Sequence, residues 1–122
     1  MAPPKQPYRP AAGGRIEMPS CTGTDCVVRL KALISDPERR WIKQRPSAVE
    51  FANGTRLFAY RALRDKLSCA ELTLALGEIE QMETTFRSAV PGISARQTSN
   101  VLALNMAVGA ELRSEFAGRC KG

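Results

Sequence analysis

Four cysteines have the widest chemical repertoire in this 122-residue sequence, because a thiol can ligate a metal, act as a nucleophile or form a disulfide. Cys21 and Cys26 lie close together, whereas Cys69 and Cys120 are each isolated in the sequence. A zinc site made of four cysteines usually consists of two local pairs, with about two to four residues between the ligands of each. Only one local pair is present, so the spacing favours two disulfides, Cys21–Cys26 and Cys69–Cys120, over a metal site.

Histidine is absent from the sequence, and its absence excludes several classes of enzyme site. Ser-His-Asp and Cys-His catalytic sites need an imidazole, as do zinc proteases with paired histidines. Cys69 remains a candidate nucleophile, because it stands at the start of a predicted helix, where the helix dipole lowers the pKa of a thiol. It lacks the usual base, so a cysteine-dependent enzyme is an alternative prediction and not the favoured one.

Carboxylates at helical spacing are the second group with chemical potential. Glu71 and Glu78 are spaced for one helix face, and Glu80 and Glu83 for another. Two carboxylates can act as acid and base in glycoside cleavage. On a helix with an apolar stripe, however, glutamates usually form the solvated face, and Glu83 is placed to pair with Arg87 one turn later. We therefore predict a solvated face, no enzymatic activity and no cofactor, with a carboxylate-dependent enzyme as an alternative.

Positive charge is concentrated in the first half of the chain. The net charge is +6 overall, +7 over residues 1–66 and −1 over residues 67–122. The densest basic cluster surrounds the only tryptophan, and its members are the predicted binding residues Arg39, Arg40, Trp41, Lys43 and Arg45. Such a cluster favours an acidic protein partner or an anionic surface. Two alternatives stay open: a solvated helix face with Trp41 buried as an anchor, and a nucleic-acid-binding protein.

Residues 1–20 contain five of the eight prolines and few large apolar side chains. Such a segment does not bury enough apolar surface to offset the entropy lost on ordering. We predict a disordered, proline-rich tail over residues 1–20 and a helical domain over residues 21–122.

Helix-start signals recur along the predicted domain. A first helix begins near Thr24 or Asp25, and a second, short helix begins at Asp36 with Pro37 in its first turn and ends before Pro46. Three capping boxes open the later helices, formed by Ser47 with Glu50, Ser68 with Glu71, and Ser94 with Gln97.

Asn53-Gly54 interrupts the third helical segment and is also a strong hairpin signal. Because the residues that follow are good helix formers, we predict a helix with a break and keep a β-hairpin as the alternative. The sequence thus predicts an all-α bundle of four to five helices.

The last two helices carry apolar stripes at helical spacing and are separated by Pro91-Gly92. The predicted connection of three residues makes them an antiparallel hairpin. This geometry places Cys120 within about one helical turn of Cys69. A disulfide between them would close a loop of roughly 50 residues and stabilise the fold by about 4 kcal/mol in the chain-entropy model.

An even set of cysteines in a small chain favours an oxidising compartment, such as a bacterial periplasm or the extracellular space. Residues 1–10 lack the apolar core of a signal peptide. We interpret the numbering as starting at a mature terminus with Met1 added, and a cytosolic protein is the alternative. The favoured function is a non-enzymatic interaction or adaptor module of an exported protein. We expect this module to bind an acidic partner through a basic face in the first half of the chain.

Overall fold

The computed structural model describes residues 24–120 of the chain. This part is helical and contains no strand, which confirms the predicted all-α class. Its elements are α2 (Thr24–Ser35), the 3-10 helix η2 (Arg40–Lys43), α3 (Ala48–Ala52), α4 (Thr55–Leu63), α5 (Cys69–Phe86) and α6 (Ala95–Arg119). The predicted tail over residues 1–20 and the predicted bond of Cys21 lie outside the described residues.

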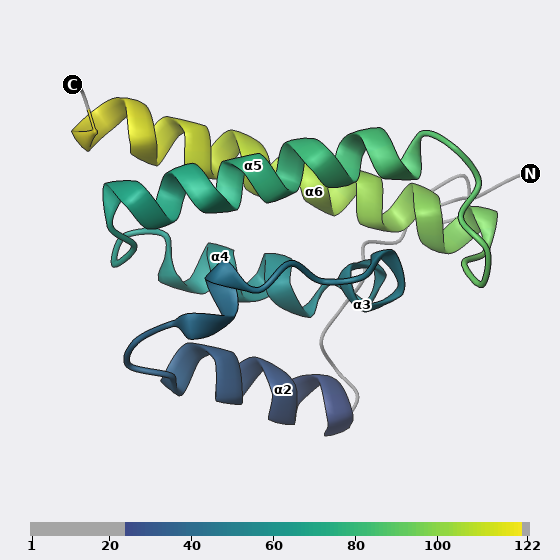
Figure 1. The fold of residues 1–122 in the computed structure, drawn as a ribbon, viewed down its shortest axis with the longest axis horizontal. Coiled ribbons are helices and arrows are strands. Elements are labelled where there is room, and N and C mark those ends of the chain that lie inside the picture. The colour runs from purple at the N-terminus through teal and green to yellow at the C-terminus, as the bar shows by residue number, and fades with distance from the viewer. Residues whose placement is uncertain (1–23, 121–122) are drawn as a thin grey trace, which may run out of the picture.

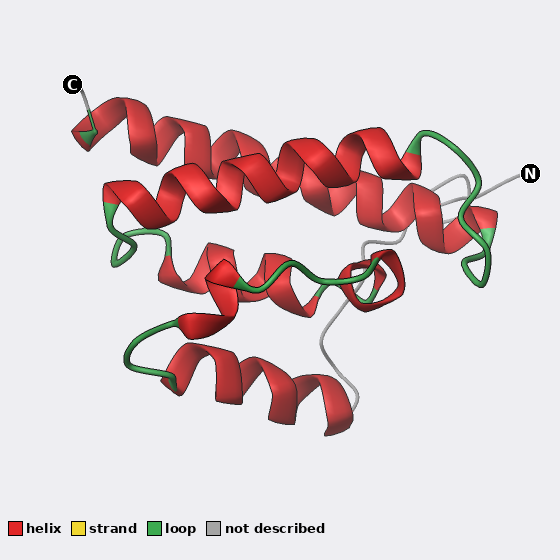
Figure 2. Cartoon of the chain, viewed as in Figure 1, coloured by secondary structure: helices red, strands yellow, loops and turns green. Residues whose placement is uncertain are grey.

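The helices form three tiers (Figure 1). α5 and α6 pack side by side in one tier, and α4, with α3 and η2 next to it, forms the middle tier. α2 packs on the far side of α4 (Figure 2). The middle tier is therefore covered on both sides, and the short segment from Ser35 to α3 runs along its edge.

The predicted C-terminal hairpin is confirmed and is joined by a disulfide at its open end. Cys69, the first residue of α5, is bonded to Cys120, and their Cα atoms are 5.7 Å apart. α6 ends at Arg119, and Cys120 has left the helical conformation, with φ −116° and ψ 35°. This departure from the helix at its last residue brings Cys120 to Cys69.

The connection between α5 and α6 differs from the prediction of three residues. α5 ends at Phe86, its last buried residue, and the loop covers residues 87–94. The backbone N–H groups of Arg87 and Ser88 bond three residues back, which tightens and ends the helix before Pro91. Pro91 and Gly92, at φ 85°, then occupy the centre of a turn closed by the Ile93 N–H and the Val90 carbonyl.

The predicted helix from Asp36 is wrong in its start and its type. The Asp36 carboxylate accepts hydrogen bonds from the backbone N–H groups of Glu38 (3.2 Å) and Arg40 (2.9 Å). These bonds stabilise a turn in place of a first helical turn, and Arg39 adopts a left-handed conformation with φ 47°. Only the four residues Arg40–Lys43 are helical, as η2.

The break at Asn53-Gly54 is a helix break, and the hairpin alternative is wrong. Gly54 has φ 82°, a conformation that strains most other residues. The Asn53 Oδ1 atom accepts from the Thr55 N–H at 2.8 Å, which starts α4 immediately after the break. The chain thereby changes direction between α3 and α4 without leaving helical structure for long.

Side-chain caps fix where the long helices begin. Both bonds of the predicted capping box form at Ser47 with Glu50 and at Ser68 with Glu71. At the third site, Ser94 accepts from the Gln97 N–H at 3.0 Å, which is one half of the predicted box. One apolar core joins the tiers, and its largest fully buried apolar side chains are Tyr60, Phe51, Leu57, Leu67, Leu72, Leu104, Leu112, Val101 and Val108.

Candidate functional site

A groove of about 470 Å³ opens where α2, the segment from η2 to α3, and the start of α4 meet. Its apolar wall is formed by Leu33, Trp41 and Pro46. Three arginines also line it, one from α2, one from the segment after η2 and one from α4, namely Arg29, Arg45 and Arg56. The volume lies within the range of small-molecule and short-segment sites.

Arg56 is held at the base of this groove by a buried ion pair. Its Nε donates to Glu78 Oε2 at 2.8 Å, and its Nη2 bonds to Glu78 Oε1. Glu78 is fully buried in α5 and also accepts from the hydroxyl of Tyr60 at 2.7 Å. Burial would lower the pKa of Arg56, but its hydrogen bonds to Glu78 raise it. Burial, together with the Glu78 charge, raises the pKa of Tyr60, so the phenol stays protonated as the donor.

The buried pair corrects the predicted solvated face. Glu78 stands between Ala75 and Met82 on the buried side of α5, and of the four glutamates only Glu80 lies fully on the exposed side. A carboxylate tolerates this position because a guanidinium, a phenol and good geometry replace its water. The one sequence signal is that Glu78 falls inside the buried arc of α5, next to Ile79.

Trp41 is 6% exposed and is fixed from several sides. Its Nε1–H donates to the Leu33 carbonyl at 3.0 Å, and its own carbonyl accepts from Arg56 Nη1 at 3.0 Å. The Arg56 guanidinium lies 5.1 Å from the indole centroid, and the Tyr60 ring lies 5.0 Å from it. Trp41 is thus a buried anchor of η2 and also one of the residues that line the groove.

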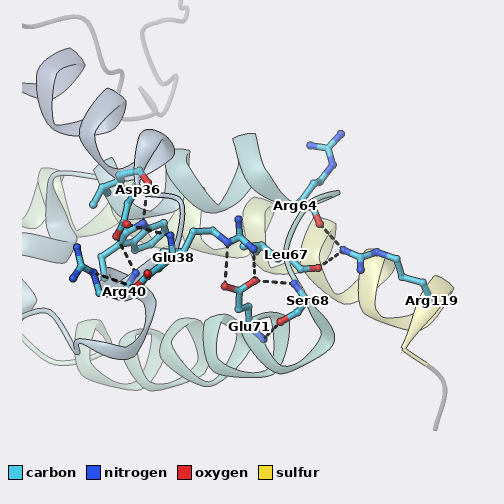
Figure 3. A network of polar contacts seen from close by, with 11 residues as sticks. Asp36, Glu38, Arg40, Arg64, Leu67, Ser68, Glu71 and Arg119 are labelled. Carbon is cyan, nitrogen blue, oxygen red and sulfur yellow. Dashed lines mark hydrogen bonds and ion pairs between the residues drawn. The ribbon is translucent and has the colours of Figure 1, made fainter.

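Arg39 forms a bidentate ion pair with Glu71 of α5, at 3.0 Å and 2.9 Å. Glu71 is therefore half-buried and serves both this pair and the cap at Ser68 (Figure 3). The Arg39 bonds lower the pKa of Glu71 and, reciprocally, the Glu71 bonds raise the pKa of Arg39. Arg39 thus positions η2 against α5 and has little of its charge left for a partner.

The other predicted binding residues remain at the surface. The Arg40 side chain is 75% exposed, and its contact with Glu38 is long, at 3.9 Å. Lys43 and Arg45 are exposed. The Arg45 Nη2 lies 3.6 Å from the position that a Cβ on Gly77 of α5 would occupy, so its side chain crosses from the groove towards α5.

Much of the remaining arginine charge is neutralised within the fold. Arg61 binds Glu111 through two bonds of 2.9 Å, and Arg64 lies 3.6 Å from the same carboxylate. The helical pairs Glu83 with Arg87, as predicted, and Glu115 with Arg119 are also formed. By contrast, Arg29, Lys43 and Arg45 make no ion pair with any described residue. Two of these three side chains line the groove.

Arg119 joins the end of α6 to the loop that precedes α5. Its Nη2 donates to the carbonyls of Arg64 (2.9 Å) and Leu67 (2.7 Å) (Figure 3), and Arg119 directly precedes Cys120 of the disulfide. The start of α5 is therefore tied to the end of α6 in two ways, by the Cys69–Cys120 bond and by the hydrogen bonds of Arg119. The Cys69 sulfur belongs to the disulfide. Cys26 is not a free thiol, and its Sγ lies 3.5 Å from Thr55 Oγ1 at the start of α4.

Comparisons of the chain with protein-family models, with curated proteins and with solved structures find no match. Within residues 24–120, no group of three or more cysteine or carboxylate side chains is arranged to hold a metal ion. None of the described helices combines the length and apolar character that crossing a membrane requires. Function is therefore argued from the groove and from the charges around it.

Proposed function

We propose that the protein is a non-enzymatic interaction module that binds an acidic partner through a basic face. We define this basic face by Arg29, Arg40, Lys43 and Arg45. Compared with the basic cluster predicted from the sequence, the basic face leaves out Arg39 and Trp41, because both act as anchors of η2. It adds Arg29 of α2. The proposal takes up the adaptor role inferred from the sequence and assigns it to four exposed basic residues, none of which makes a two-bond ion pair with a carboxylate among residues 24–120.

The observation that carries the proposal is the contrast between paired and unpaired arginines. Arg39, Arg56 and Arg61 each make two hydrogen bonds to one carboxylate, whereas Arg29 and Arg45 have no such partner among residues 24–120. Like charges left together on a surface repel one another and raise the local positive potential. A partner with carboxylates relieves this repulsion and gains affinity and association rate from it.

A double charge reversal of Arg40 and Lys43 to glutamate tests the proposal. We expect the wild-type protein to bind polyglutamate in low salt and to lose affinity as salt rises towards about 0.15 M, because exposed charges are screened. The double variant is expected to bind at least about tenfold more weakly, since four units of charge change at the binding face. Fluorescence anisotropy of labelled polyglutamate measures both effects, and circular dichroism verifies the fold.

The matched control is Lys66→Glu with Arg113→Glu, which changes net charge equally at exposed positions outside the basic face. Equal losses in both double variants would show that binding follows net charge alone and would refute the basic face. Duplex DNA serves as a second probe. Tighter binding of DNA than of polyglutamate, with loss in the Arg40/Lys43 variant, would favour the nucleic-acid alternative.

We also propose that the protein works in an oxidising compartment outside the cytosol. The support is the Cys69–Cys120 disulfide, because such bonds are rare in reducing compartments. Thiol alkylation of intact cells, followed by peptide mapping, is expected to leave Cys69 and Cys120 unmodified unless a reductant is added first. Complete alkylation of both residues without reductant would place the working protein in a reducing compartment and contradict the proposal.

A further inference from the structure

The groove beside the basic face combines charge with an apolar wall. Arg29 of α2 and Arg45, which follows η2, both line it, together with the apolar residues Leu33, Trp41 and Pro46. A flat surface that binds a partner through salt bridges alone needs charged side chains and no apolar wall. A groove with an apolar wall also selects an apolar group carried between the partner's negative charges.

The polar groups of the groove suit a peptide main chain. Gln44 and Asn53, which carry side-chain amides, both line the groove, although the Asn53 Oδ1 atom already accepts from the Thr55 N–H. An amide offers both a donor and an acceptor, as a peptide unit requires. Most N–H groups of the Arg56 guanidinium, by contrast, already donate to Glu78, Tyr60 and the Trp41 carbonyl. Arg56 therefore shapes the groove but offers few donors to a ligand.

Glu50 places one negative charge at the rim of the groove. It lines the groove as an exposed side chain, and the backbone N–H of Ser47, together with the charges of Arg56 and Arg29, lowers the pKa of its carboxyl. The positive charge available to a ligand is therefore greatest beside Arg45, away from this carboxylate, and a ligand with a few separated carboxylates suits the groove better than a uniformly charged chain.

We propose that the groove binds an extended acidic peptide segment of a partner protein, with one apolar side chain against Leu33, Trp41 and Pro46 and flanking carboxylates on Arg29 and Arg45. This inference rests on the proposed function and narrows it from an acidic partner to an acidic segment with an apolar residue inside it. Binding then depends on groove shape as well as on charge.

Trp41 supplies the readout, because it is the only tryptophan in the chain and is one of the residues that line the groove. Three synthetic probes separate the contributions. The first is a blocked pentapeptide with leucine between two pairs of glutamates, the second has serine in place of leucine, and the third has glutamine in place of every glutamate. We expect the leucine peptide to change Trp41 fluorescence in a saturable way and to bind about tenfold more tightly than the serine peptide, as burial of one leucine side chain allows.

Two variants test the two halves of the site. Ala32→Phe adds an uncharged ring to the groove lining and is expected to abolish the preference for leucine over serine. Arg29→Glu with Arg45→Glu is expected to weaken binding of both acidic peptides at least about tenfold, while the control pair Lys66→Glu and Arg113→Glu weakens it less. The glutamine peptide is expected not to bind.

The outcomes separate this inference from the proposed function. If polyglutamate binding depends on Arg40 and Lys43, but the leucine and serine peptides bind equally and Ala32→Phe has no effect, the groove inference is wrong and the basic face stands. If no acidic probe binds the wild-type protein, both are wrong. A saturable Trp41 response to duplex DNA but to none of the peptides would overturn the peptide as the occupant of the groove.

Discussion

Replacing Glu78 by alanine is expected to lower the free energy of unfolding by about 3–5 kcal/mol, because it leaves the Arg56 guanidinium buried without its counter-charge. The side chain of Arg56 is only 11% exposed, and that of Glu78 is fully buried. The Tyr60 hydroxyl also loses the carboxylate to which it donates. Urea denaturation followed by circular dichroism measures the loss.

Glu80→Ala is the matched control, since Glu80 lies on the exposed side of the same helix. We expect it to change stability by less than about 0.5 kcal/mol. Combining Glu78→Leu with Arg56→Met removes both charges and is expected to recover most of the loss, as apolar replacements of buried ion pairs do. Equal stability of Glu78→Ala and Glu80→Ala would mean that the buried pair contributes nothing.

The same substitution is expected to disturb the basic face. Arg56 Nη1 holds the Trp41 carbonyl, and the guanidinium lies against the indole ring. Without Glu78, the position of Arg56 is no longer fixed, and η2 loses one of its anchors. The tryptophan emission of Glu78→Ala is therefore expected to differ from that of the wild type under native conditions, whereas that of Glu80→Ala stays unchanged.

Helix starts were predictable because they depend on a few neighbouring residues. The boxes at Ser47 and Ser68 are formed by side chains three residues apart, and their chemistry is local. The Asn53-Gly54 break was predictable for the same reason. The two errors in helix bounds are also local, since the Asp36 side chain and the residues before Pro91 allow more than one pattern of hydrogen bonds.

The buried ion pairs were not predictable from local pattern. The helical spacing places Glu78 on the buried side of α5 and Glu80 on the exposed side, but the counter-charge that lets Glu78 stay ionised there comes from Arg56, on another helix. Arg39 and Arg45 are likewise close neighbours in the basic cluster, yet Glu71 neutralises one and leaves the other free. The sequence therefore predicted that the first half of the chain is basic. Ion pairs between different helices decide which of its charged side chains remain for a binding partner.

The disulfide is the second feature with a large expected effect. It joins residues 51 apart in the sequence, and closing a loop of this length removes entropy from the unfolded chain and raises its free energy by about 4 kcal/mol in the chain-entropy model. Cys69→Ser with Cys120→Ser is therefore expected to lower the free energy of unfolding by about this amount. This loss is a large fraction of a total stability of about 5–15 kcal/mol for a domain of ordinary size.

The double serine variant is nevertheless expected to keep the helix hairpin in the native state. Arg119 still donates to the carbonyls of Arg64 and Leu67, and Leu72, Leu104 and Leu112 remain buried in the core. Far-UV circular dichroism should match the wild type at low temperature, while the urea midpoint falls. Arg119→Ala, with the disulfide intact, is the comparison and is expected to cost about 1–3 kcal/mol through the lost hydrogen bonds.

A loss below about 1 kcal/mol in the double serine variant would contradict the entropic account, because it would mean that the unfolded chain already holds these ends together. A loss of native helix content would contradict the role given to Arg119 and the core. The triple variant, with Arg119→Ala added to both serines, separates these cases. If Arg119 replaces part of the missing crosslink, removing it should cost more in the serine background than in the disulfide-bonded protein, and a double-mutant cycle measures that difference.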